Sequence, residues 1–266
     1  MTVNLGNKLN DIVRSAKHAL FDQGELAQLS YGAFNIAATH MQSAEHEEVD
    51  VTFPVGWRPD RQPINSTRKY EKQQLLVRYQ FLASHQLSVN GLFQLVTIVE
   101  TMFGEVIRAI VSKYPQKMGS KRTIALQTVL EALSLEDIHI RALDSLINDL
   151  AYKSPVDFAE SFKELASVNL LECPAFHKYM EIKATRDIFI HNRGVANDTY
   201  VRKASSHARV GSGKQLPADT VYFLESYESC LQLNEWLEEQ LHEIWHSSRF
   251  DEERARQIEM NLQYPE

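Results

Sequence analysis

Arg186 and His191 are residues whose types and spacing suit chemistry on a phosphodiester. Cleavage of RNA without a metal needs a base for the ribose 2′-hydroxyl, a cation for the charge on the pentacoordinate phosphate, and a proton for the departing 5′-oxygen. A histidine suits both proton transfers because its ordinary pKa lies near neutrality. An arginine suits the charge because its planar fork donates to two phosphate oxygens and stays protonated. The pair is therefore suited to chemistry on a phosphate group.

The context of this pair matters more than its spacing. An arginine followed by a histidine after four to six residues also occurs at two other places, Arg78 with His85 and Arg202 with His207. The pair at 186 and 191 is different because it lies in the last turns of a predicted helix over 174–192, and Gly194 follows as a helix stop signal. We expect the side chains of Arg78 and His85 to be solvent-exposed on one face of a long helix.

The neighbours of the pair complete a longer pattern, Arg186-Asp187-x3-His191-Asn192 followed by Gly194 and Tyr200. This pattern resembles the signature of HEPN domains (higher eukaryotes and prokaryotes nucleotide-binding), and outside the motif the resemblance is one of helical pattern over about residues 70–247. The resemblance implies an endoribonuclease that leaves a 2′,3′-cyclic phosphate and a 5′-hydroxyl. It also implies a toxin or phage-defence setting, in which an inhibitory protein partner restrains the enzyme.

A single Arg–His pair is expected to provide too little rate enhancement by itself. Acid–base help from one histidine gives roughly 10²–10⁴-fold, and charge stabilisation is usually a larger contribution. A second pair is therefore expected. The family resemblance implies its source, a two-fold homodimer in which two motif helices form one composite cleft.

Supporting roles follow from position in the motif. Asp187 lies four residues before His191, so it shares a helical face with His191 and is expected to orient the imidazole or to raise its pKa. Asn192 is expected either to position substrate or to close the helix. RNA contacts are predicted for a further set, Arg193, Tyr200, Arg202 and Lys203. For Arg193 and Tyr200 the alternative is a surface or packing role.

The charge distribution limits the kind of nucleic-acid contact. The net charge is −7, which argues against passive binding of nucleic acid by bulk electrostatics. Residues 186–214 nevertheless hold six basic residues against two acidic ones, whereas residues 225–266 hold eleven acidic residues against three basic ones. A local phosphate site fits this distribution better than a long nucleic-acid groove, although a solvated basic loop is the alternative.

The composition points to a cytoplasmic protein with no membrane segment. No run of about 18 apolar residues exists in the sequence, and its first residues lack the pattern of a secretory signal. The two cysteines, Cys173 and Cys230, lie far apart and predict neither a disulfide framework nor a metal site. We expect no cofactor.

The helical periodicity predicts an all-α fold, a multi-helix bundle of HEPN type. Three parts are expected: an N-terminal helical extension and proline-containing linker (1–65), the HEPN-like domain (66–247) and an acidic C-terminal helix or tail (248–266). The predicted helices cover residues 8–21, 26–42, 68–88, 92–114, 120–133, 134–151, 154–166 and 174–192, a long segment that starts at 219, and 250–262. Helix 92–114 carries one apolar stripe, and Ser120, Ser134 and Ser154 are predicted helix caps. A short strand is predicted at 49–53, a break or kink at Asn90-Gly91 and a mobile loop at 195–218.

Two rival interpretations remain. His242-Glu243-Ile244-Trp245-His246 matches the His-Glu-x-x-His pattern of zinc metalloproteases, but no sheet is predicted above this helix and only about twenty residues follow it. A zinc protease is therefore the third-ranked interpretation, and the alternative for these residues is a solvent-exposed helix face.

The second-ranked interpretation is a non-catalytic HEPN-type module that binds nucleotides or proteins. For such a module, the acidic C-terminal segment would offer a surface for a partner.

Overall fold

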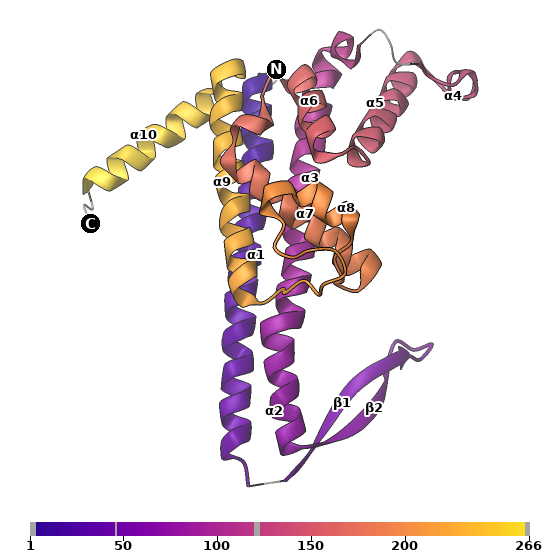
Figure 1. Cartoon of the computed structure of the whole chain (residues 1–266). Coiled ribbons are helices and arrows are strands. Elements are labelled where there is room, and N and C mark those ends of the chain that lie inside the picture. The colour runs from indigo at the N-terminus through magenta and orange to yellow at the C-terminus, as the bar shows by residue number, and fades with distance from the viewer. Residues whose placement is uncertain (1–3, 46, 120–122, 264–266) are drawn as a thin grey trace.

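The molecule is mostly helical (Figure 1). The structure is a computed structural model, and it describes residues 4–45, 47–119 and 123–263. The predicted all-α class is thereby confirmed in its coarse form, with a two-stranded antiparallel sheet as an addition. Within the described ranges, no helix combines the length and the apolar character needed to cross a membrane.

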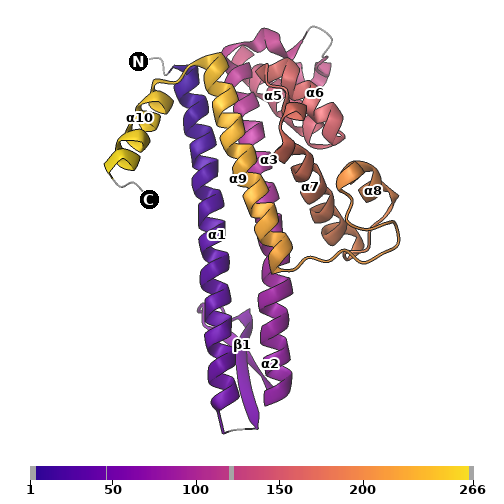
Figure 2. The same cartoon turned by 60° about the vertical axis from the view of Figure 1, so that its left-hand side comes forward.

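Three long helices run side by side and form the centre of the bundle (Figures 1 and 2). They are α1 (Leu5–Ser43), α3 (Leu87–Lys113) and α9 (Thr220–Trp245). The apolar stripe predicted for α3 is confirmed, because its members are buried in one core: Leu92, Leu95, Val96, Val99, Met102, Phe103, Val106, Ile107 and Ile110. Burial of such a stripe is the main source of stability for a helix of this kind.

The first helix corrects the predicted organisation of the N-terminus. Residues 5–43 form one continuous helix and not two, and its first half contributes Leu9, Val13 and Leu20 to the same core as α3 and α9. Gly24 lies inside this helix, at a place where α1 approaches α9 closely. A Cβ at Gly24 would lie 2.8 Å from the ring of Tyr227 in α9. The predicted extension is therefore, in its first half, part of the bundle.

Residues 48–71 form a β-hairpin where the sequence predicted a linker with one short strand. Strand β1 (Glu48–Trp57) pairs antiparallel with β2 (Pro63–Glu71), with Thr52 opposite Thr67. The alternation of β-branched and polar residues along β1 favours this structure over the prolines that suggested a loop. The hairpin projects beside the lower half of the bundle (Figure 1), and each of its side chains is at least partly exposed.

The hairpin leads into one long helical element. Helix α2 (Lys72–Phe81) continues through a π-helical turn (Leu82–Gln86) into α3. No helix break occurs at Asn90-Gly91, because both residues lie inside α3. Gly91 instead makes room for Phe223 of α9, whose Cε2 would lie 2.5 Å from a Cβ at this position.

Three shorter helices cover one end of the bundle: α4 (Leu126–Leu130), α5 (Leu135–Ala151) and α6 (Pro155–Ala166). The predicted caps of α5 and α6 are confirmed, because Ser134 accepts a hydrogen bond from the Asp137 amide and Ser154 accepts one from the Asp157 amide. The helix predicted over 120–133 is reduced to α4, and its expected cap, Ser120, lies outside the described residues. Helix α10 (Ser248–Gln263) follows α9 and packs on α1.

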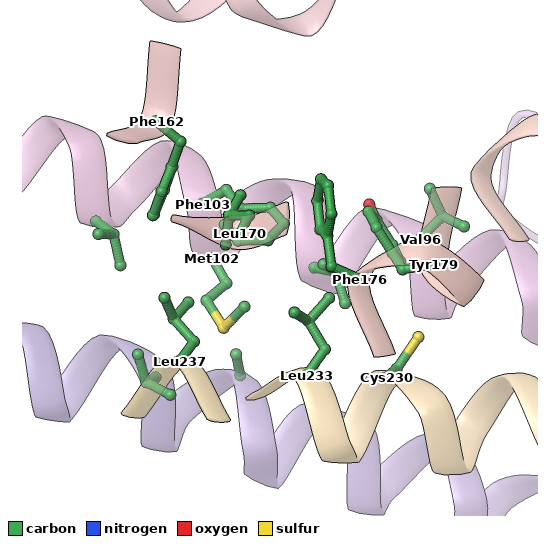
Figure 3. Packing of buried hydrophobic residues seen from close by; sticks show 14 of the residues in the cluster. Val96, Met102, Phe103, Phe162, Leu170, Phe176, Tyr179, Cys230, Leu233 and Leu237 are labelled. Atoms are coloured by element: carbon green, nitrogen blue, oxygen red, sulfur yellow. The ribbon is translucent and has the colours of Figure 1, made fainter. Parts of the chain in front are cut away.

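A cluster of aromatic rings joins α3, α6 and α7 (Pro174–Asn192) around Phe103 (Figure 3). The Phe103 ring makes edge-to-face contacts with Phe162, Phe176 and Tyr179, at centroid distances of 5.2, 6.4 and 6.2 Å. Such contacts add to the energy of apolar burial. The cluster therefore holds α7, which carries the Arg–His motif, firmly against the bundle.

Candidate functional site

Helix α7 ends where the motif predicts. Pro174 opens the helix at its first turn, and Asn192 is its last residue. Arg193 and Gly194 then take the left-handed conformation, with φ values of 52° and 81°, and the Gly194 amide donates to the Ile188 carbonyl (3.2 Å). Arg186 and His191 are thus positioned by a rigid, packed helix.

Arg186 is anchored by a carboxylate that the sequence could not place. Glu100 of α3 accepts a hydrogen bond from Arg186 Nη2 (2.8 Å) and also pairs with Lys183. Asp187 Oδ1 lies 3.3 Å from Arg186 Nε, but this ion pair lacks the geometry of a hydrogen bond, so the buried Nε has no hydrogen-bond acceptor among the described residues. A buried donor of this kind is a point at which a ligand oxygen would gain a partner.

Both motif residues line one open pocket of about 520 Å³. Four cationic side chains lie around it, Lys153, Lys183, Arg186 and Lys203, against two carboxylates, Glu100 and Asp187. His191 is exposed in the pocket wall. The excess of positive charge, together with an imidazole, makes this pocket suitable for a phosphate group.

Lys183 is perturbed by this environment. Burial, together with the nearby Arg186 and Lys203 cations, lowers the pKa of Lys183 to about 8, whereas the Asp187 carboxylate acts in the opposite direction. The ion pair with Glu100 also favours the charged form. A strongly shifted group that lies in a pocket is a marker of a functional site.

Asp187 has a different role from the predicted one. Its two carboxylate oxygens face cations, with Oδ1 near Arg186 and Oδ2 accepting a hydrogen bond from Lys203 Nζ (3.2 Å). Asp187 therefore links α7 to α8 (Asp198–Ala204), which carries Lys203, where the sequence predicted that it would orient His191.

The segment after the motif is folded, which corrects the predicted mobile loop. Asn197 caps α8 by accepting a hydrogen bond from the Tyr200 amide (2.9 Å), and Val195 forms a β-bridge with Gln215. A second hydrophobic cluster holds the segment to α7: Ala184, Ile188, Ala196, Tyr200, Ala204 and Leu216. Lys203 is therefore fixed beside the pocket.

A buried glutamate ties this segment to the rest of the molecule. Glu181, which is 4% exposed, accepts hydrogen bonds from the hydroxyls of Tyr200 and Tyr222, each at 2.8 Å, and from Arg209 Nε at 3.0 Å. Arg209 also donates to the Pro217 carbonyl (2.6 Å). The paired charges and their hydrogen bonds join α7, α8 and α9.

The remaining predicted contacts have mixed positions. Tyr200 is 1% exposed and its hydroxyl is bonded to Glu181, so it takes the packing role that was the alternative to an RNA contact. Asn192 donates to the Val195 carbonyl and closes the helix end, the second of its two predicted roles. Lys203 lies in the pocket wall, and Arg193 and Arg202 are exposed.

The geometry at the end of α9 does not support the zinc interpretation. His246 lies beyond the helix end with φ of 43°, so the two histidines do not share a helical face. Both ring nitrogens of His242 are engaged, since Nδ1 accepts from the Ser247 amide (3.1 Å) and Nε2 faces Asp251 (3.3 Å). Across the described chain, no three side chains of metal-binding type lie close enough together to hold an ion.

His85 was predicted to be solvent-exposed, and the structure places it differently. It is half-buried, its Nδ1 lies 3.1 Å from the Ala218 carbonyl, and its ring is 6.1 Å from that of Phe189 in α7. His85 therefore belongs to the packing around the motif helix.

Comparison with known proteins adds no identification. No family model, no curated protein and no solved structure matches this chain.

Sequence reasoning did not assign Glu100, Lys153, Lys183, Glu181 or Arg209 to a site. The only local signal was the position of Lys183, three residues before Arg186 and hence on the same helical face. Glu100 is a charge within a strongly apolar helix, and such a residue usually has a specific partner.

Proposed function

We propose that this protein is a metal-independent endoribonuclease that uses Arg186 and His191, as the resemblance to HEPN domains implies. The observation that carries the proposal is that both residues line the same open, cation-rich pocket. Arg186 lines this pocket with its guanidinium held by Glu100, and its Nε makes no hydrogen bond among the described residues. RNA is the substrate class because the chemistry requires a 2′-hydroxyl.

In the proposed reaction, His191 removes the proton from the ribose 2′-hydroxyl. The 2′-oxygen then forms a bond to phosphorus, and the bond from phosphorus to the 5′-oxygen breaks, leaving a 2′,3′-cyclic phosphate. His191 of the partner subunit gives a proton to the 5′-oxygen. Arg186, which Glu100 holds in place, stabilises the charge that develops on the phosphate oxygens, and Lys183 and Lys203 add to this field.

The surface beside the pocket is suited to a second copy of the chain. Tyr152 lines the pocket with 92% of its surface exposed, and Ile190 of α7 is half-exposed beside His191. Exposed aromatic and aliphatic side chains of this kind are common in the centre of protein interfaces. We propose that α7 meets its symmetry mate here and that the two pockets join into one composite cleft, which holds one pair of catalytic residues from each subunit.

The test is cleavage of a mixed RNA substrate in EDTA by the wild-type protein and two variants, His191→Ala and His242→Ala. We expect the wild-type and His242→Ala proteins to give the same products with 2′,3′-cyclic phosphate ends. His191→Ala should lose at least about 100-fold in rate, because general acid–base help contributes 10²–10⁴-fold. Activity that is unchanged in His191→Ala, or that EDTA removes, would contradict the proposal.

A non-catalytic interaction module is the second candidate. It is favoured by the ion pairs that already neutralise Arg186, since Glu100 and Asp187 both lie against its guanidinium. In this case, or in a toxin held inactive, an inhibitory partner would bind the pocket face. The acidic α10 does not cover that face, because it packs on α1, on the opposite side of the bundle from α8 (Figures 1 and 2).

A further inference from the structure

A second pocket lies next to the candidate active site and has a different character. It has a volume of about 130 Å³, and its wall is mainly aromatic and aliphatic, with Phe103, Phe158, Phe176 and Tyr179 among its residues. Four residues line both this pocket and the cation-rich one: Glu100, Ala151, Lys153 and Lys183. One ligand can therefore place a ring in the aromatic pocket and an anionic group in the cation-rich pocket.

The size of this pocket restricts the ring. A cavity of about 150 Å³ lined by aliphatic and aromatic side chains takes up benzene. The 130 Å³ pocket is thus matched to a single six-membered ring, and it is small for the fused ring system of a purine. Gly104 of α3 contributes to the available space, because it has no side chain and lies in the pocket wall.

One residue of the pocket wall, Tyr179, has a polar group without a partner among the described residues. Tyr179 is 4% exposed, and its buried hydroxyl makes no hydrogen bond within the described part of the chain. Figure 3 shows this hydroxyl at the end of the ring that points away from Cys230, beside Phe176. A buried hydroxyl without a partner is unfavourable unless a ligand or water satisfies it. The ligand ring is therefore expected to carry a hydrogen-bonding group.

From these observations we propose that the pocket around Tyr179 binds a pyrimidine base of the RNA substrate while the adjacent phosphate occupies the cation-rich pocket. The base would stack against the aromatic wall, and one of its polar groups would bond the Tyr179 hydroxyl. The inference depends on the proposed function for the identity of the ligand as RNA. It adds a preference for pyrimidine at the cleavage site.

The test measures binding without cleavage, by titration calorimetry with four probes: uridine, cytidine and guanosine 3′-monophosphates and inorganic phosphate. We expect the two pyrimidine nucleotides to bind about tenfold or more tightly than guanosine 3′-monophosphate and phosphate. Stacking of one base on an aromatic side chain accounts for a difference of this size. Phosphate has no base to stack, and the fused ring system of guanine is too large for the 130 Å³ pocket. Equal affinities, or no measurable binding of any nucleotide, would overturn the inference.

Variants locate the binding. Gly104→Leu should fill the pocket and reduce pyrimidine nucleotides to the affinity of phosphate, because a Cβ at Gly104 meets its nearest atom at 3.7 Å and the rest of the side chain enters the free space. The matched control is Gly32→Leu, a helical position with nothing within 4 Å of the new Cβ. Pyrimidine binding that survives Gly104→Leu would place the base elsewhere and overturn the inference.

Tyr179→Phe separates a ligand contact from a structural one. It should weaken pyrimidine nucleotides about three- to tenfold without lowering Tm, because the hydroxyl has no partner to lose in the free protein. A fall in Tm with unchanged nucleotide affinity would contradict the assignment. Pyrimidine binding without RNA cleavage would refute the proposed ribonuclease activity but support the pyrimidine site. RNA cleavage without a preference between bases would support the ribonuclease activity but refute the pyrimidine site.

Discussion

At the scale of single residues, Lys183 makes the pocket sensitive to pH. Because its pKa is lowered to about 8, Lys183 is charged below that pH and becomes neutral as the pH rises through it. We expect the affinity for sulfate, which stays a dianion throughout, to fall roughly three- to tenfold between pH 7 and pH 9, the size of one partly exposed charge contact. Lys183→Arg should remove this dependence, because a guanidinium stays protonated. A wild-type profile as flat as that of the variant would contradict this assignment.

Glu181 is the residue on which the local fold around the pocket depends most. Glu181→Gln removes the negative charge that Arg209 faces and puts amide donors among hydroxyl and guanidinium donors. We expect a loss of about 2–3 kcal/mol in the free energy of unfolding, somewhat below the usual range for one member of a buried pair because Arg209 is partly exposed. Urea unfolding measures this free energy. Glu100→Gln is the comparison, and it should cause a smaller loss because Glu100 is half-buried. A Glu181→Gln protein as stable as the wild type would show that the network is not a structural requirement.

At the scale of elements, glycines within α3 have opposite roles. Gly91→Ala should destabilise the protein by about 1–3 kcal/mol, because the new Cβ would overlap the buried ring of Phe223 at 2.5 Å. Gly104→Ala has its nearest contact at 3.7 Å and should stabilise the protein by up to about 1 kcal/mol through helix propensity. Thermal unfolding of the two variants side by side tests the close approach of α3 and α9, and a stabilising Gly91→Ala would contradict it.

Elements with local signals were predictable from the sequence. The caps at Ser134 and Ser154 and the end of α7 at Asn192 depend on residues within one turn, and the structure confirms them. The hairpin at 48–71 was missed because its prolines and Gly56 suggested a loop. Gly91 was misread as a helix break because its reason, the ring of Phe223, comes from a helix 132 residues later in the chain (223 − 91).

The candidate site was predictable only in part, for the same reason. The sequence placed Arg186 and His191 together because they share one helix. It could not place Glu100 beside Arg186, because the two are separated by 86 residues and come together only when α3 packs on α7. It also gave no sign that residues 195–218 would fold against α7, since the contacts of Glu181 with Arg209 and Tyr222 join residues that are 28 and 41 positions apart.

At the scale of the whole molecule, the proposed mechanism requires two chains in one site, and mixing experiments test this requirement. When inactive His191→Ala protein is exchanged with an equal amount of wild type, random pairing leaves only about one quarter of the dimers with two intact subunits. If each site needs both pairs, the activity per total protein should fall to about a quarter of the wild-type value. A monomeric enzyme would retain about half, because the variant would only dilute it.

The control for this experiment is a variant whose substitution lies away from the pocket. His242→Ala fits, because His242 lies at the far end of α9, where it stacks on Phe250, and mixing it with wild type should leave the activity unchanged. Light scattering of each preparation should give the mass of two chains. Retention of half the activity together with a monomeric mass would refute the composite site. A single His191 would then have to act as both base and acid. This is difficult for one side chain, because the 5′-oxygen leaves on the side of the phosphorus opposite the attacking 2′-oxygen.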